Sequence, residues 1–279
     1  MMMDFAGKSL DLSVPHVMGI VNVTPDSFSD GGRFFSADKA LEQARKLVAD
    51  GATIIDIGGE STRPGSEPVG VDEEIRRVVP AIQAIRAELD VVISIDTMKA
   101  DVMRAAVAAG ASMINDVNAL RGEGALQAAV ELNVPVCLMH MQGTPQTMQQ
   151  QPQYADVVSE VNNFLNERVA ACEAAGISRS KIILDPGFGF GKTARHNLRL
   201  MKHLAVFTDS DLPVLVGVSR KSIIGATLNV SVEERLAGSL ALASIAFWQG
   251  AKIIRSHDVR ETVQVIRLCE HVMQVSDFD

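Results

Sequence analysis

The chain has 279 residues, and its composition excludes several classes of protein before any motif is considered. A hydrophobic content of 47% supplies ample material for one large core, while the longest apolar runs are too short to span a bilayer. The net charge of −8 and the lack of a basic run argue against nucleic acid as a partner. These features favour a globular protein that acts on small molecules.

The cysteines and the first residues bear on the compartment in which the chain works. Cys137, Cys172 and Cys269 are scattered and form no C-x-x-C pair, which is typical of reduced thiols packed as small apolar side chains. The first 16 residues include an early acid, Asp4, and no continuous apolar stretch, so a signal peptide is not expected. We expect a cytoplasmic protein.

In chain order, short apolar runs alternate with longer amphipathic segments. The runs are continuously hydrophobic, which is typical of parallel strands covered on both faces. They occupy residues 16–21, 53–57, 91–95, 112–115, 134–139, 181–184, 213–218 and 251–254. Apolar spacings of three and four predict helices at 37–50, 72–89, 99–109, 125–132, 154–175, 198–207, 232–249 and 259–275.

Local signals mark the ends of several of these helices. Ser231 with Glu234, and Asp258 with Glu261, look like capping pairs that begin the last two helices. Glycine tolerates the left-handed conformation that ends a helix, and it follows four of the predicted helices. These are Gly51, Gly110, Gly176 and Gly250.

Eight strand–helix repeats in a chain of this length predict an α/β protein with one domain, residues 1–279, folded as a (β/α)8 TIM barrel. A doubly wound open sheet is the alternative, although it usually has fewer strands. The residues before the first strand predict a short hairpin around Gly7 and Lys8 that closes the barrel floor.

Polar residues follow all eight predicted strands, and enzymes with this fold place their chemistry at the carboxyl ends of the strands. After a single strand, such a residue is usually a turn or a cap. Eight sets at one rim indicate a site. The rim residues are Asn22, Asp56, 60–63, Asp96, Thr97, Asn115, Asp116, His140, Asp185, 219–222 and 255–258.

The rim residues separate into two sets by their chemistry. A deep set, Asp96, Asn115, Asp185 and Lys221, could bind a flat heterocycle, because one carboxylate can accept two adjacent N–H donors. Buried structural ion pairs, such as Asp185 with Lys221, are the alternative.

A shallower, cationic set consists of Asn22, Arg63, Arg255 and His257. In an acidic protein it suggests a phosphate group held by fixed donors. His257 alone could equally be a helix-capping residue.

The glycine-rich segment 185–193 resembles a P-loop, but the full spacing would need glycine in place of Pro186, and the dinucleotide pattern would need glycine in place of Lys192. A flexible loop that presents Phe188 and Phe190 to a ligand is the better interpretation. Only two of the six histidines lie on the rim, so a protein-bound zinc site is not expected.

Two long motifs carry a family resemblance that extends over essentially the whole chain. Asn-Val-Thr-Pro-Asp-Ser-Phe-Ser-Asp-Gly-Gly at 22–32 and Asp-Ile-Gly-Gly-Glu-Ser-Thr-Arg-Pro-Gly at 56–65 resemble the first two signatures of dihydropteroate synthases. Shorter matches occur at 95–97, 114–116, 138–141, 184–191, 219–222 and 255–258. Ser256 departs from the family pattern, in which an aliphatic residue separates the arginine and the histidine.

The resemblance implies a binding role for each rim set. The pterin ring would be bound by Asp96, Asn115, Asp185 and Lys221. The pyrophosphate would be bound by Asn22, Arg63, Arg255 and His257, with Mg²⁺ bridging its oxygens and the amide oxygen of Asn22. The p-aminobenzoate would be framed by Phe28, Thr62, Pro64, Phe190 and Ser222, with its carboxylate near Ser222 and the start of the following helix.

The implied reaction joins a pterin pyrophosphate to p-aminobenzoate and releases pyrophosphate. The implied order is departure of pyrophosphate before amine attack, because the dihydropterin is electron-rich. The implied catalytic residues are Asp30, Asp185, Lys221, Arg255 and His257.

Two other functions stay open from the sequence: a pterin- or folate-binding methyltransferase domain, and a non-catalytic pterin-binding protein. The resemblance also implies inhibition by sulfonamides. Small residues in the predicted helix at 232–249 favour close helix packing, and a homodimer through the C-terminal helices is expected.

Overall fold

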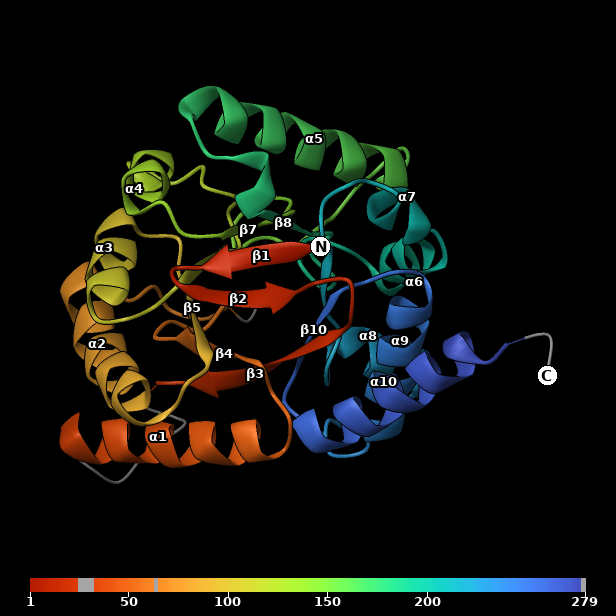
Figure 1. Ribbon diagram of the computed structural model, residues 1–279. Coiled ribbons are helices and arrows are strands. Elements are labelled where there is room, and N and C mark those ends of the chain that lie inside the picture. The colour runs from red at the N-terminus through yellow and green to blue at the C-terminus, as the bar shows by residue number, and fades with distance from the viewer. Residues whose placement is uncertain (25–32, 63–64, 277–279) are drawn as a thin grey trace.

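Eight parallel strands form a nearly closed barrel in a computed structural model that describes residues 1–24, 33–62 and 65–276 (Figure 1). The strands pair in the order β8-β7-β6-β5-β4-β3-β10-β9. A parallel bridge between Leu184 and Val214 joins the two edge strands. The TIM barrel predicted from the strand–helix repeats is therefore confirmed, and the open sheet is excluded.

Each barrel strand lies within two residues of a predicted run. The strands are β3 (His16–Asn22), β4 (Ile54–Gly58), β5 (Val92–Asp96), β6 (Met113–Asp116), β7 (Val136–Met139), β8 (Ile182–Asp185), β9 (Leu215–Gly217) and β10 (Ile253–Ser256). Nearly every position in them is buried, which explains why the runs are continuously apolar.

Helices surround the barrel (Figure 1). They are α1 (Arg33–Ala49), α2 (Val71–Glu88), α3 (Ala100–Ala108), α4 (Ala125–Leu132), α5 (Val157–Ala175), α6 (Ala194–Lys202), α7 (Ala205–Thr208), α8 (Ser222–Leu228), α9 (Leu236–Trp248) and α10 (Val259–Gln274), with a 3-10 turn, η2, at Arg179–Lys181. In the described part of the chain, none of them combines the length and apolar character needed to cross a bilayer.

Most predicted helices differ from the structure only at their ends, by up to four residues, and the larger differences lie after residue 190. The segment predicted as one helix at 198–207 is two helices, α6 and α7, and α8 was not predicted. The helix predicted from residue 232 begins only at Leu236. Ser231 and Glu234 do bond, backbone amide to carboxylate at 3.1 Å, but within a turn before the helix, so the capping prediction there is wrong.

The other helix-end signals give a mixed result. The four predicted helix-ending glycines all have a left-handed backbone, with φ from 98° to 117°. Asp258 does precede α10 and Glu261 lies in its first turn, yet the Asp258 side chain makes no capping hydrogen bond. Its carboxylate is occupied by Arg220, whose Nε donates to it at 2.9 Å.

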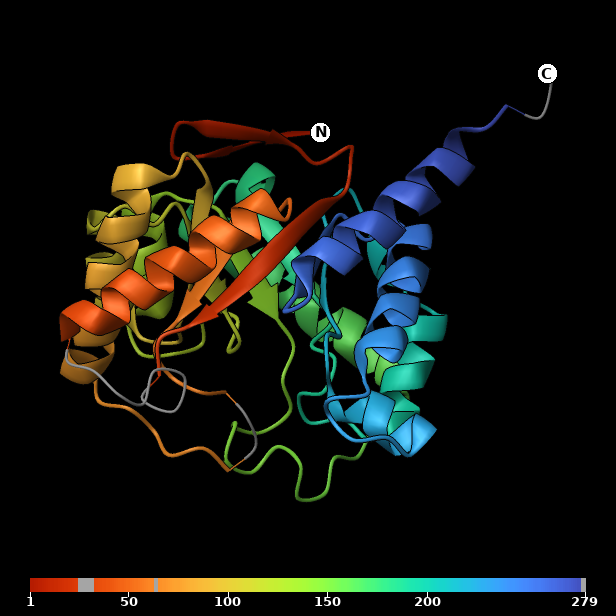
Figure 2. The same ribbon diagram turned by 90° about the horizontal axis from the view of Figure 1, so that it is seen from below.

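The predicted N-terminal hairpin is present and seals one end of the barrel (Figure 2). It consists of β1 (Met2–Phe5) and β2 (Lys8–Asp11), paired antiparallel. Three buried residues at this end, Met3, Phe5 and Leu12, pack on a layer to which every barrel strand contributes one side chain. The layer, here called the floor, comprises Met18, Ile54, Val92, Met113, Cys137, Ile183, Leu215 and Ile253.

The side chains directly above the floor follow from strand alternation, because every second residue of a barrel strand points inward. Two residues farther along each strand, the apolar layer is replaced by a largely polar one. It consists of Ile20, Asp56, Ser94, Asn115, Met139, Asp185, Gly217 and Arg255. The interior of the barrel thus changes from hydrocarbon to charge within one step toward the carboxyl ends of the strands, the end here called the mouth.

Candidate active site

A hydrogen-bonded cluster around Arg255 lies inside the mouth of the barrel. The Nε of Arg255 donates to Asp56 Oδ2 at 2.7 Å, and its Nη2 donates to Asp96 Oδ2 at 2.9 Å. The amide of Asn115 donates to the same Asp56 oxygen at 3.2 Å. The structure therefore brings together Asp96, Asn115 and Arg255, which the sequence had assigned to two separate sets.

Asp56 is the residue of this cluster that sequence reasoning did not assign. It is fully buried in the middle of β4, and it holds both Arg255 and Asn115. Its signal was present: it lies two residues after Ile54, so alternation places it on the inner face of the barrel. A carboxylate inside a strand that is otherwise apolar needs a cationic partner, and Arg255 supplies it.

Three acceptors in this region are buried and have no hydrogen-bond partner within 1–24, 33–62 and 65–276: Oδ1 of Asp56, Oδ1 of Asp96 and Oγ of Ser94. Burial raises the pKa of Asp96 to about 7, and the charge of Asp56 adds to this rise while Arg255 opposes it. Unpaired buried acceptors are costly, and a ligand with N–H donors would satisfy them. The cluster can therefore bind a flat, donor-rich group.

Asp185 and Lys221 face the same space from β8 and from the start of α8. Asp185 Oδ1 accepts a hydrogen bond from the Gly187 amide at 2.7 Å. The Lys221 ammonium donates to the Phe188 carbonyl and lies 4.7 Å from the centre of the Phe190 ring. The charges of Lys221 and Asp185 attract each other, but the hydrogen bond of the ammonium is to the Phe188 carbonyl. Burial lowers the pKa of Lys221 to about 8, with the charge of Asp185 opposing this change.

The loop between β8 and α6 is organised by a buried lysine. Lys192 Nζ donates to the carbonyls of Gly187 at 2.8 Å and Phe190 at 3.0 Å, and shares a 2.8 Å hydrogen bond with His140 Nδ1. At Gly187 φ is +71°, and a Cβ there would lie 1.9 Å from the His140 carbonyl oxygen. The expectation for Phe188 is wrong, because its side chain is fully buried in the core.

The residues of the shallower, cationic set do not form one cluster in the structure. Arg255 belongs to the deep cluster, whereas His257 is exposed and shares a 3.1 Å hydrogen bond with Ser219. Asn22 ends β3 opposite Gly58, and its side chain has no hydrogen-bond partner among the described residues. Its amide is therefore available to a ligand.

Ser256, the departure from the family pattern, points away from this site. It is 2% exposed, and its Oγ shares a 2.9 Å hydrogen bond with Thr262 and accepts one from the Asp258 amide at 3.1 Å. The hydroxyl therefore supports the start of α10. It does not contact the cluster at the mouth.

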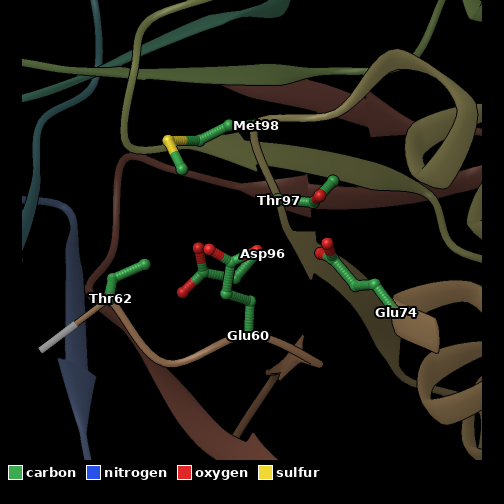
Figure 3. Close-up of a pocket in the computed structure, with 6 residues that line it drawn as sticks. All are labelled: Glu60, Thr62, Glu74, Asp96, Thr97 and Met98. Carbon is green, nitrogen blue, oxygen red and sulfur yellow. The ribbon is translucent and has the colours of Figure 1, made fainter. Parts of the chain in front are cut away.

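The residues predicted to frame p-aminobenzoate lie around the same mouth where they are described. Phe190 is half-buried beside Lys221, and Ser222 is exposed at the first position of α8. A pocket beside Asp96 is lined by Glu60, Thr62, Glu74, Asp96, Thr97 and Met98 (Figure 3). Four further predicted residues lie outside the described part of the chain: Phe28, Asp30, Arg63 and Pro64.

Among the described residues, no group of three or more histidine, cysteine or acidic side chains could hold a metal ion. The amide oxygen of Asn22, for which no partner is seen in the described part of the chain, fits another arrangement. Mg²⁺ commonly takes one or two protein oxygens and completes its shell with water and substrate phosphates. The residues present are compatible with an ion carried by a phosphorylated ligand.

Comparisons with known proteins fit this geometry. The model of the family described as "Pterin binding enzyme" matches residues 18–257. A dihydropteroate synthase of Escherichia coli K12 is 55% identical over 271 residues, which cover 97% of this chain and 96% of that protein. The chain belongs to the pterin binding enzyme family and, within it, to the dihydropteroate synthases.

Solved structures agree. A Yersinia pestis dihydropteroate synthase in complex with a sulfonamide drug has a TM-score of 0.94 and 50% identity, over 99% of this chain and 100% of that one. A Xanthomonas albilineans dihydropteroate synthase in complex with 7,8-dihydropteroate has a TM-score of 0.90 and 46% identity, with the same coverage.

Proposed function

We propose that this chain condenses 6-hydroxymethyl-7,8-dihydropterin pyrophosphate with p-aminobenzoate to give 7,8-dihydropteroate and pyrophosphate, a step of folate biosynthesis. The observation that carries the proposal is the buried cluster of Asp56, Asp96, Asn115 and Arg255 at the barrel mouth, next to Asp185 and Lys221, in a chain of this family. The product named in the Xanthomonas albilineans complex is the same compound.

The pterin ring is proposed to lie against Asp96, Asn115, Asp185 and Lys221. Its N–C–N edge offers adjacent donors, and Asp185 and Asp96 can accept them side by side. Oδ1 of Asp96 has no hydrogen-bond partner among the residues that the structure describes, so it would gain a hydrogen bond to the ring without losing one there.

The pyrophosphate is proposed to lie above the ring, near Asn22, Arg63, Arg255 and His257. Arg255 already bonds two carboxylates through Nε and Nη2, which fixes its plane and leaves further N–H groups to donate. Bound Mg²⁺, held by Asn22 and the pyrophosphate oxygens, would neutralise negative charge on the leaving group.

In the reaction, the bond between the methylene carbon and the pyrophosphate oxygen breaks, and the arylamine nitrogen bonds to that carbon and loses one proton. Arg255 and His257 would stabilise charge on the departing oxygens, and Asp30 and Asp185 would stabilise positive charge on the pterin. The amine proton can leave to solvent or to the released pyrophosphate, so no side-chain nucleophile is required.

The p-aminobenzoate is proposed to lie between the pocket beside Asp96 and the start of α8, framed by Phe28, Thr62, Pro64, Phe190 and Ser222. Sulfonamides share its flat aniline and acidic head, and the Yersinia pestis relative is described in complex with one. We expect competitive inhibition by sulfonamides with respect to p-aminobenzoate.

The function is tested by measuring pyrophosphate release from the pterin pyrophosphate with and without p-aminobenzoate. We expect release that depends on the amine and on Mg²⁺, together with formation of dihydropteroate. A protein that binds the pterin but releases no pyrophosphate in the presence of the amine contradicts the proposal.

A homodimer through the C-terminal helices is also proposed. Large apolar side chains are exposed on α9 and α10, which pack on each other. They include Ile245 at 45%, Trp248 at 55%, Leu268 at 66% and Val272 at 54% exposure. Such a patch favours burial against a second copy. Light scattering should give the mass of two chains, and Trp248→Glu should shift it toward the mass of one chain.

We place the enzyme in the cytoplasm, in keeping with its free cysteines.

A further inference from the structure

Two carboxylates and one ammonium form a compact cluster beside the pocket at the barrel mouth. Lys99 immediately precedes α3, and its Nζ donates to Glu60, which follows β4, and to Glu74 in the first turn of α2. We call these three residues the Lys99 cluster. It joins the segment after β4 to the two helices that flank it.

The Lys99 cluster is largely withdrawn from water. The exposed fractions of its side chains are 24% for Lys99, 9% for Glu60 and 1% for Glu74. Burial alone would lower the pKa of Lys99, but hydrogen bonds to the two carboxylates raise it above its ordinary value. A buried carboxylate is tolerated only with a partner, so Lys99 fixes where both carboxylates can lie.

The backbone just before Glu60 is fixed independently. Arg77 of α2 donates to the Gly59 carbonyl at 2.9 Å. A Cβ on Gly59 would lie 2.8 Å from Val78 and 3.0 Å from the stem of Glu74, so the chain lies directly on α2 here. Beyond Gly59, the contact between Lys99 and Glu60 links this segment to the start of α3.

The Lys99 cluster lies next to a proposed substrate residue. Glu60 and Glu74 line the same pocket as Asp96 and Thr62, and Thr62 is only two residues beyond Glu60 (Figure 3). The described start of this segment therefore has its position set at Glu60, two residues before the residue that we assign to p-aminobenzoate.

We propose that Lys99 is a positioning residue for the arylamine site: through Glu60 it sets the place of Thr62, and so it governs the KM for p-aminobenzoate more than the KM for the pterin pyrophosphate. The inference rests on the proposed function. It assigns Lys99 no contact with either substrate, because its ammonium is occupied by the two glutamates.

The test uses two variants of the full-length enzyme. Glu60→Gln keeps the shape of the side chain and leaves Lys99 paired with Glu74, so the protein should fold normally. Lys99→Met removes the tie and leaves two carboxylates without their cation. We expect the KM for p-aminobenzoate to rise about fivefold in Glu60→Gln and at least tenfold in Lys99→Met, with the KM for the pterin pyrophosphate changed less than twofold.

Lys99→Arg is a conservative variant that can still bond both carboxylates. Its KM for p-aminobenzoate should stay within threefold of the wild-type value.

A matched control is available on the same helix. Arg104 of α3 also holds two carboxylates, Asp101 at 3.3 Å and Glu131 at 3.0 Å, but on the outer surface. Arg104→Met should leave both KM values unchanged. An unchanged KM for p-aminobenzoate in Glu60→Gln and Lys99→Met overturns the inference. An equal rise of both KM values also overturns it, as does a KM for p-aminobenzoate in Lys99→Arg that rises as far as in Lys99→Met. If the wild-type enzyme releases no pyrophosphate, the proposed function fails instead.

Discussion

The floor and the mouth of the barrel are built from the same eight strands, and they differ in the side chains that point into the barrel. At the floor every strand contributes an apolar side chain, under a hairpin that excludes water. Two residues farther along, the inward positions carry Asp56, Ser94, Asn115, Asp185 and Arg255. The apolar floor stabilises the fold. At the mouth, buried oxygens of Asp56, Ser94 and Asp96 have no hydrogen-bond partner among the described residues, which lowers stability. A bound ligand could donate hydrogen bonds to these oxygens.

The largest expected effect lies at the floor. Phe5 is 1% exposed and covers the apolar layer from the hairpin. Phe5→Ala should lower the free energy of unfolding by about 4 kcal/mol, because it leaves a cavity in addition to losing apolar burial. Urea denaturation measures this change. Steady-state kinetics at a temperature where the variant is folded should show unchanged KM values. A selective rise in one KM would break the separation between the two ends.

At the mouth, Arg255→Met should affect both stability and activity. It leaves Asp56 and Asp96 buried without their cation, which should cost about 3 kcal/mol. It also removes the proposed donor to the leaving group, which should lower kcat about a hundredfold. Denaturation and pyrophosphate release measure the two effects. A variant that loses stability while keeping its kcat would make Arg255 a structural residue only.

The pH dependence of pterin binding sharpens the comparison further. Burial, with the charge of Asp56 adding to it, raises the pKa of Asp96 from 3.8 to about 7. Between those values the folded protein holds a proton that the unfolded chain releases, so the contribution of Asp96 to stability falls as pH rises from about 4 to 7. N–H donors on the pterin favour the ionised carboxylate of Asp96. The affinity of the protein for the pterin should therefore increase up to about tenfold per pH unit as the pH rises from 5 to 7.

Calorimetry of 6-hydroxymethyl-7,8-dihydropterin binding across this pH range is the measurement. Asp96→Asn, which has no proton to lose, serves as the control and should bind with a flat pH dependence. Identical pH profiles for the variant and the wild type would show that Asp96 is not the titrating group.

The smallest effect is expected at Ser256, which lies between two proposed site residues but points outward. Ser256→Ala removes the hydrogen bond from the amide of Asp258, the residue before α10, and should cost about 1 kcal/mol of stability. The KM for the pterin pyrophosphate should not change. A raised KM would mean that the outer face of β10 also contributes to the mouth.

Most of the barrel could be predicted from the sequence, because its strands are buried on both sides and form continuous apolar runs. The failures are local. The helix after Lys221 was not predicted because Ser222–Leu228 has only seven residues and follows a polar cluster. The segment at 198–207 was predicted as one helix, since a break between α6 and α7 leaves its apolar spacing intact.

The site was predicted less completely than the fold. Motif positions identified Asp96, Asn115 and Asp185, but motif order alone could not show that Arg255 lies among them, since that contact joins residues 159 positions apart. Alternation from the floor would have identified Asp56 and Ser94. Phe188 was misplaced because a glycine-rich sequence does not show which of its two phenylalanines faces the core, and the buried contacts of Lys192 decide this.

The central claim, that the polar layer above the floor binds the pterin, is tested most directly by titration calorimetry of 6-hydroxymethyl-7,8-dihydropterin with Asp185→Asn and the wild type. The substitution keeps the shape of the side chain and removes the charge that the pterin edge would meet. The account predicts a loss of at least ~1.5 kcal/mol, roughly tenfold in Kd, with no loss of folding. Equal affinity of the two proteins for the pterin would contradict it.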